Sequence, residues 1–225
     1  MIRPAIRRRA VVPRTPAAPR NGASHRGIVA LVMATAMAAL LPAGVAEAHL
    51  VNTGFGPFYD GISHLFVTAP DILAVIALAL LAGLRGKRPS RAALMTLTAA
   101  WTVGGIAGLL TRPEVVWAPA TTATFLLLGA LLAADRELPA PAISSLAAAV
   151  GLLHGFLNGA EAASSGIGLV GLLGSLSALF VMATLGAAFA VTLADGWTRI
   201  GLRVAGSWIA AIGILMLGWL LRPGA

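Results

Sequence analysis

The sequence predicts an all-α, polytopic membrane protein: a bundle of six transmembrane helices that follows a cleaved signal peptide. Apolar residues make up 58% of the 225-residue chain and charged residues only 11%, which is far from the composition of a soluble domain. The mean hydropathy is +0.89. After a basic leader come six apolar stretches, and most of them reach the roughly 20 residues that a membrane-crossing helix needs.

The leader has the order of parts that a secretory signal requires. A segment rich in Arg and Pro precedes the apolar run Ile28–Ala46, and Ala46, Glu47 and Ala48 then form a small-x-small cleavage site. We therefore expect residues 1–48 to be a signal peptide and residues 49–225 to be one six-span transmembrane domain. An uncleaved signal anchor is the alternative. Cleavage after Ala48 would make His49 the first residue of the mature chain.

The net charge of +8 does not indicate a nucleic-acid-binding surface. Seven of the sixteen Lys and Arg residues lie before residue 27, and only nine basic and seven acidic residues follow from His49 onward. The basic excess therefore belongs to the leader. The chain has no Cys, which excludes disulfides, thiolate metal sites and Cys nucleophiles.

The six apolar stretches are joined by short connections, which favours an up-down bundle. We expect them at residues 59–84, 92–111, 115–134, 142–160, 166–194 and 200–221. The first stretch contains a break: Thr68 suits an N-cap and Pro70 suits the first turn of a restarted helix. A short outer segment over 59–67 followed by a longer helix is one interpretation, and a plain proline kink is the other.

Glycine ridges on the second and fourth stretches predict close helix packing. Gly104 and Gly108 lie four residues apart on the second, and Gly151, Gly155 and Gly159 continue this spacing on the fourth. Small residues at this spacing let two backbones approach closely in a membrane. The fourth-stretch ridge runs beside a polar stripe, which should therefore face the bundle.

Loop charges predict the orientation. The loops at 85–91, 135–141 and 195–199, with the start of the sixth stretch, carry seven basic residues. The opposite loops carry two, Arg112 and Arg222. The positive-inside rule places the first side in the cytoplasm and the mature N-terminus outside. We thus expect a multi-pass protein of the bacterial inner (cytoplasmic) membrane.

Two polar clusters interrupt the apolar stretches, and both lie toward the predicted external face. The segment GPFYDGISHLFVTAPD carries three polar residues and LLHGFLNGAE carries three more. On continuous helices the spacings would align each set along one stripe. The members are Asp60, His64 and Asp71 in the first cluster, and His154, Asn158 and Glu161 in the second.

Ionisable groups inside a bilayer are costly and mark ion or substrate paths. Imidazole suits Ni, Cu, Zn or Co, and carboxylate and amide oxygens add hard ligands. An N-terminal His49 could chelate such an ion through its amino group and its imidazole. The alternative for each single residue is structural, because a membrane His or Asn often only hydrogen-bonds a neighbouring helix.

The sequence resembles the HupE/UreJ family, most closely the subgroup with a G-P-F-Y-D-G-x-x-H segment. The residues that carry the resemblance are GFGPFYDGISHLFVTAPDILAVIALALLAGLRG, HGFLNGAE and the Ala-His start after the leader, and it covers residues 49–222. The resemblance implies a six-span membrane protein associated with hydrogenase or urease gene clusters, acting as a nickel or cobalt permease or as an accessory protein.

Carried over by position, the resemblance implies roles for five residues: His49, Asp60, His64, His154 and Glu161. The better-known branch has H-P and D-H pairs in the first motif, where this chain has Gly56-Pro57 and Ser63-His64. It also has a second His in the fourth-span motif, where this chain has Asn158. Fewer imidazoles imply weaker or different metal selectivity.

The resulting hypothesis is a secondary, ATP-independent uptake permease for Ni²⁺ or Co²⁺. The ion would be the substrate, with no tightly bound cofactor. His49 and Asp60 would capture it, and His64, His154, Asn158 and Glu161 would pass it inward, with Asp71 as a further ligand or proton-coupling group.

Two alternatives stay open. One is a non-transporting metal-binding accessory protein that serves hydrogenase or urease maturation proteins. The other is a membrane enzyme, which the lack of HExxH and GxSxG motifs disfavours. The expected partners are the lipid bilayer and the metal ion, with no nucleic acid, and the oligomeric state is left open.

Overall fold

The computed structural model describes residues 52–113, 117–193 and 196–222, and these residues form seven helices and no strand. The predicted all-α membrane architecture is confirmed. The signal peptide, its cleavage site and His49 lie outside the described residues. The division into a leader and a six-span domain therefore stays a prediction.

The helix bounds follow the predicted stretches closely. The helices are α2 (Pro57–Val67), α3 (Ala69–Gly83), α4 (Lys87–Thr111), α5 (Ala118–Ala133), α6 (Ala140–Ser164), α7 (Gly168–Thr192) and α8 (Gly196–Leu220). Four of them, α4, α6, α7 and α8, have 25 residues each and are long and apolar enough to cross a membrane. The bent pair of α2 and α3 qualifies as a fifth span, whereas α5 has only 16 residues. The chain is thus a multi-pass membrane protein, and the count of six spans stays a prediction.

The first apolar stretch is broken at Thr68. The axes of α2 and α3 form an angle of 74°. Thr68 has extended backbone angles (φ −84°, ψ 92°) and occupies the N-cap position of α3, with Pro70 in its first turn. The Thr68 side chain makes no capping hydrogen bond. The predicted break is therefore confirmed. The idea of one helical stripe through Asp60, His64 and Asp71 is wrong, because Asp71 belongs to a separate helix.

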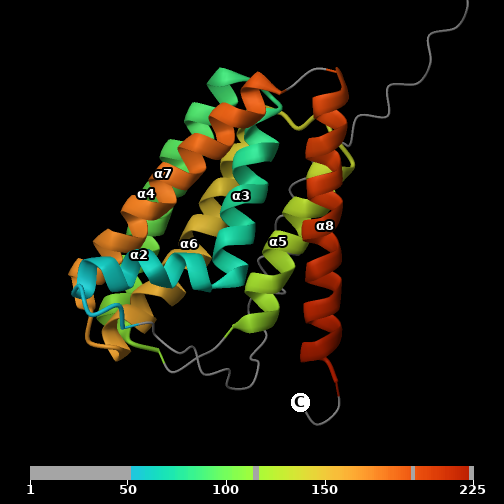
Figure 1. Ribbon diagram of the computed structural model, residues 1–225. Helices are drawn as coiled ribbons and strands as arrows, with labels where there is room; N and C mark the ends of the chain where they lie inside the picture. Colours follow the sequence, from blue (N-terminus) through green and yellow to red (C-terminus); the bar gives the residue numbers. More distant parts are fainter. Residues whose placement is uncertain (1–51, 114–116, 194–195, 223–225) are drawn as a thin grey trace, which may run out of the picture.

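The other helices alternate in direction along the bundle (Figure 1). α2 lies across one end of the bundle and packs against α7; at this end α4, α6 and α8 finish and α3, α5 and α7 begin. We call this the polar end. The opposite end, where α3, α5 and α7 finish and α4, α6 and α8 begin, is the basic end. The short connections thus produce the up-down arrangement that the sequence predicts.

The predicted glycine ridges pack α4 directly against α6. A Cβ on Gly108 would meet the backbone of Phe156, and a Cβ on Gly159 would meet the backbone of Gly105. Likewise a Cβ on Gly155 would meet the backbone of Trp101. The two backbones approach so closely that no side chain fits between them, which is how small residues stabilise helix pairs in membranes.

Two more helix pairs approach closely at glycine residues. Gly61 of α2 lies against the backbone of Gly171 of α7, and Gly129 of α5 lies against the backbone of Gly206 of α8. The first contact places α2 across the start of α7. The second joins α5 and α8, which lie side by side along one flank of the bundle (Figure 1).

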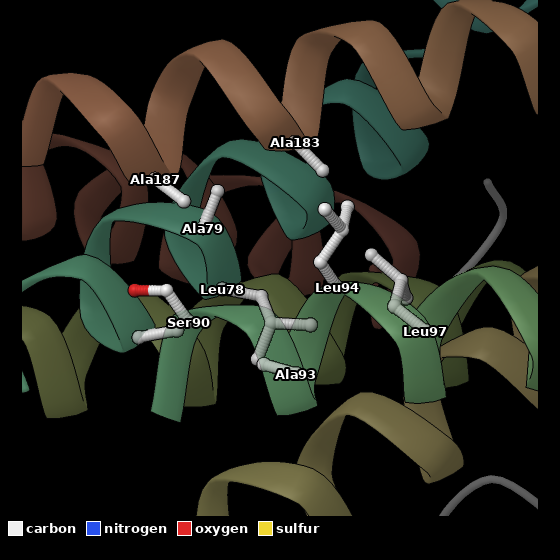
Figure 2. Close-up of a pocket in the computed structure, with 9 residues that line it drawn as sticks. Leu78, Ala79, Ser90, Ala93, Leu94, Leu97, Ala183 and Ala187 are labelled. Atoms are coloured by element: carbon white, nitrogen blue, oxygen red, sulfur yellow. The ribbon is translucent and has the colours of Figure 1, made fainter. Parts of the chain in front are cut away.

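The interior between α3, α4 and α7 is almost filled. A cavity of about 10 Å³ lies there, and Figure 2 shows the side chains that line it, which are mostly Ala and Leu. Its one hydroxyl, on Ser90, donates to the carbonyl of Gly86. Since none of the predicted metal-site residues lines this cavity, it is a packing gap and has no ligands for a cation.

An ion-pair cluster joins three helices at the basic end. Asp135, just after α5, accepts hydrogen bonds from Arg85 Nη2 at 2.7 Å and from Arg199 Nε at 2.6 Å and Nη2 at 2.9 Å. Arg85 follows α3, and Arg199 lies in the first turn of α8. The hydrogen bond from Arg199 is the main cause that lowers the pKa of Asp135, and the charges of both arginines add to it.

We expect Asp135→Asn to lower thermal stability at neutral pH by on the order of 1 kcal/mol. Asparagine keeps the volume and tolerates the left-handed backbone of this position (φ 48°), so the charge is what changes. Because the folded-state pKa lies below the ordinary value of 3.8, the stabilisation is present above that value and is lost as pH falls through the folded-state pKa. Melting curves in detergent at neutral and at strongly acidic pH test this. An equal difference at both would contradict it.

Candidate functional site

The two polar clusters of the sequence meet inside the bundle. Asp71 Oδ1 lies 2.6 Å from His154 Nδ1, and Asp71 Oδ2 accepts a hydrogen bond from Asn158 Nδ2 at 2.7 Å. Asn158 Nδ2 also lies 3.0 Å from the carbonyl oxygen of His154. The structure therefore joins a residue of the first cluster to two residues of the second. We call Asp71, His154 and Asn158 the inner triad.

Each member of the inner triad is placed by local structure. Asp71 lies in the first turn of α3, so the break at Thr68 is what turns this carboxylate toward α6. His154 and Asn158 are one helical turn apart on α6 and therefore point to the same side. The imidazole of His154 is stacked on the Trp101 ring with centroids 5.7 Å apart. Gly155 permits this stacking, because any side chain there would meet the Trp101 backbone.

The inner triad is almost completely removed from solvent. His154 is 0% exposed, Asp71 3% and Asn158 5%. Burying a carboxylate without partners would be very costly, and here three side chains share hydrogen bonds that offset part of this cost. A structure that needed only packing would reach the same burial with apolar side chains at less cost.

A second pair lies between α2 and α6, and we call it the outer pair. His64 Nε2 is 3.3 Å from Glu161 Oε2 and 3.4 Å from the Thr68 hydroxyl. The His64 side chain is 6% exposed and that of Glu161 22%. Glu161 lies near the C-terminal end of α6, two helical turns beyond His154. The outer pair is therefore nearer to the surface of the polar end than the inner triad is.

Asp60 is bonded to the segment that precedes α2. Its Oδ1 accepts hydrogen bonds from the backbone N–H of Thr53 at 2.7 Å and from the Thr53 hydroxyl at 2.6 Å. These bonds tie the segment before α2 back onto that helix. Asp60 and His64 lie one turn apart on α2, but the hydrogen bonds of Asp60 bring it to Thr53 and not to the outer pair.

Sequence reasoning missed Thr124, Trp101 and Thr53. The Thr124 hydroxyl lies 2.8 Å from His154 Nε2, so α5 also contributes to the site. The sequence signal was the run of threonines in APATTATF, which is unusual in an otherwise apolar stretch. Trp101 gave no signal that separates it from an ordinary core residue.

Three buried atoms of the site have no hydrogen-bond partner in the described part of the chain: His64 Nδ1, Glu161 Oε1 and Asn158 Oδ1. They are a nitrogen and two oxygens, the donor types that first-row divalent ions accept. Among residues 52–113, 117–193 and 196–222, however, no group of three or more His, Asp or Glu side chains could hold a metal ion. The site thus offers potential ligands in pairs, without a closed cage.

Comparison with protein families matches the chain to the family described as HupE / UreJ protein over residues 36–216. This range includes all seven helices of the described part except the last four residues of α8. No curated protein and no solved structure gave a match.

Proposed function

This chain belongs to the HupE/UreJ family, and from that premise we propose that it is a secondary, ATP-independent uptake permease for Ni²⁺ or Co²⁺. The family suggests a nickel or cobalt permease or an accessory role. The choice of transport is supported by the geometry of the polar end. There, Asp71 of the first cluster contacts His154 and Asn158 of the second, and His64 of the first lies beside Glu161 of the second.

The observation that carries the proposal is the contact of Asp71 with His154 and Asn158 at 2.6 and 2.7 Å. A carboxylate, an imidazole and an amide meet in the interior of an apolar bundle, where such groups mark ion paths. A metal ion entering here would be the substrate. It would replace the hydrogen bond between Asp71 and His154 with bonds to Asp71 Oδ1 and His154 Nδ1.

The path runs through the site in steps. Asp60 and His49 attract the cation at the polar end, although His49 lies outside the described residues. The outer pair of His64 and Glu161 then offers one imidazole nitrogen and one carboxylate oxygen that have no other partner. The inner triad receives the ion next, and Asn158 Oδ1 adds an oxygen ligand there.

Ligands in pairs suit transport better than storage. Conduction requires sites that bind an ion strongly enough to admit it and weakly enough to release it. Stepwise exchange between the outer pair and the inner triad fulfils this condition, because neither is a closed coordination shell. The proposal includes no catalytic step.

The proposed orientation of the protein in the membrane follows from the charges at the two ends of the bundle. The basic end carries the residues Arg85, Lys87, Arg88, Arg91, Arg136, Arg199 and Arg203, whereas Arg112 and Arg222 lie at the polar end. By the positive-inside rule the basic end faces the cytoplasm and the polar end faces outward. In a bacterial inner membrane, external metal would then reach the outer pair before the inner triad.

The deciding experiment is uptake of radioactive nickel and cobalt into proteoliposomes. We expect flux with the wild-type protein, and a loss of about tenfold or more in His64→Ala, because a divalent ion loses the imidazole of the outer pair and one such contact contributes about 1.4 kcal/mol or more. Binding of metal without flux would instead favour the accessory role with hydrogenase or urease maturation proteins as partners.

Glutamate substitutions provide a matched pair for the same assay. Glu161→Gln removes the carboxylate of the outer pair, whereas Glu137→Gln removes an exposed carboxylate of the loop between α5 and α6 at the basic end. We expect uptake to fall by about tenfold in the first variant and to stay near wild type in the second. Equal uptake in both would remove Glu161 from the path.

A further inference from the structure

The hydroxyl of Thr124 has two neighbours and one proton. Thr124 Oγ1 lies 2.6 Å from the carbonyl oxygen of Thr121 and 2.8 Å from His154 Nε2. Thr124 is 6% exposed and His154 is 0% exposed, so solvent does not compete for these contacts. A threonine hydroxyl can donate once and accept twice. The two distances therefore determine which way each hydrogen bond runs.

The contact with Thr121 uses the hydroxyl proton. A carbonyl oxygen has no proton of its own, so two oxygens 2.6 Å apart attract each other only if the Thr124 proton lies between them. Thr124 then has only lone pairs to offer His154. A contact of 2.8 Å between Oγ1 and Nε2 is a hydrogen bond only if Nε2 carries a proton and donates it.

We propose that Thr124 is a positioning residue that fixes the ring of His154 with a proton on Nε2, so that Nδ1 is the ring nitrogen presented to Asp71 and to a metal ion. Ligating histidines commonly donate their second ring nitrogen to an oxygen acceptor, which sets the tautomer and the ring orientation. Trp101, stacked on the same ring, limits tilting, whereas Thr124 decides which nitrogen is available.

The consequence for transport rests on the proposed function. With Nε2 committed to Thr124, a divalent cation binds His154 through Nδ1 and Asp71 through Oδ1, where the two atoms are now 2.6 Å apart. A contact this short also needs a proton between Nδ1 and Oδ1, and that proton passes to water at the polar end as the ion enters. Without the Thr124 hydroxyl, a neutral His154 would carry its proton on Nδ1 and donate it to Asp71, leaving the free lone pair on Nε2 and facing α5.

The chain offers a closely matched set of variants. Thr124→Val removes the hydroxyl and keeps the shape, and Thr124→Ser keeps the hydroxyl. Thr122→Val is the control: Thr122 lies on the same helix, is 0% exposed, and its hydroxyl donates to the carbonyl of Ala118 at 2.7 Å. It therefore tests the loss of a buried threonine hydroxyl that is bonded to backbone and not to His154.

The first readout is nitrogen NMR of metal-free protein labelled with ¹⁵N-histidine, with the His154 signals identified by their absence in His154→Gln. We expect a proton on Nε2 in the wild type, in Thr124→Ser and in Thr122→Val. In Thr124→Val we expect the Nε2 proton to be lost. A wild-type His154 without a proton on Nε2 would overturn the inference, and this measurement needs no variant at position 124 to fold.

The second readout is nickel uptake in proteoliposomes. We expect the KM for nickel to rise about tenfold in Thr124→Val and to change less than about twofold in Thr124→Ser and Thr122→Val. An unchanged KM in Thr124→Val with an altered tautomer would overturn the role in transport. If the wild type moves no metal, the proposed function fails, whereas the NMR result still decides the tautomer of His154.

Discussion

Asp71→Asn is expected to abolish metal uptake, with a loss of about a hundredfold or more. The substitution keeps the size of the side chain and removes the one carboxyl group of the inner triad. A charge-assisted contact contributes about 1.5–3 kcal/mol, and 2.7 kcal/mol corresponds to about a hundredfold. The measurement is the initial rate of nickel and cobalt uptake in proteoliposomes containing equal amounts of protein.

The control for this prediction is Asp135→Asn, the same substitution in the ion-pair cluster at the basic end. Asp135 bonds two arginines and no member of the inner triad. At a temperature where the Asp135→Asn variant is folded, its metal uptake should therefore stay within about threefold of the wild-type rate. Size-exclusion chromatography in detergent should show both variants as monodisperse protein. Equal loss of uptake in both would mean that charge removal acts through stability and not through the path.

Gly159→Leu is expected to prevent formation of the folded bundle. A Cβ at this position would meet the carbonyl group of Gly105, and backbone cannot move aside as the end of a flexible side chain can. Overpacking of a core costs about 1–3 kcal/mol, and a clash with backbone lies at or beyond the upper limit of that range. Separating α4 from α6 would also displace His154 from Trp101.

This prediction is checked by the fraction of monodisperse protein and by the melting temperature in detergent. Gly201→Leu is the control, because Gly201 is also helical and exposed, and nothing lies within 4 Å of an added Cβ. There we expect unchanged or slightly higher stability, since glycine in a helix costs roughly 1 kcal/mol relative to alanine. A folded Gly159→Leu protein with wild-type melting behaviour would contradict the packing of α4 on α6.

Much of the fold was predictable because membrane helices are encoded locally. The apolar stretch at 92–111 predicted α4, which the structure extends to Lys87–Thr111. The break at Thr68 was predictable because a proline follows shortly after a residue that suits an N-cap. The glycine ridge of Gly151, Gly155 and Gly159 was predictable because four-residue spacing places all three on one face.

The site was only partly predictable, since contacts between helices depend on angles that local sequence does not contain. His154 and Asn158 lie one helical turn apart on the same side of α6, as their spacing indicated. Asp71 was expected on the stripe of Asp60 and His64, but the 74° bend turns it instead toward α6. Thr124 was missed because its partner is 30 positions away on another helix.

By itself, the sequence determined the class of the protein, the approximate bounds of its helices, the glycine-lined faces and the polar residues of the two clusters. These properties depend on hydrophobicity and periodicity within single segments, where the bilayer acts on each helix separately. Only the tertiary structure decided that the two clusters meet, that Asp71 pairs with His154 and that Thr124 holds the opposite side of the same ring. Those contacts join helices far apart in the chain, and their geometry follows from how the glycine faces let the backbones approach.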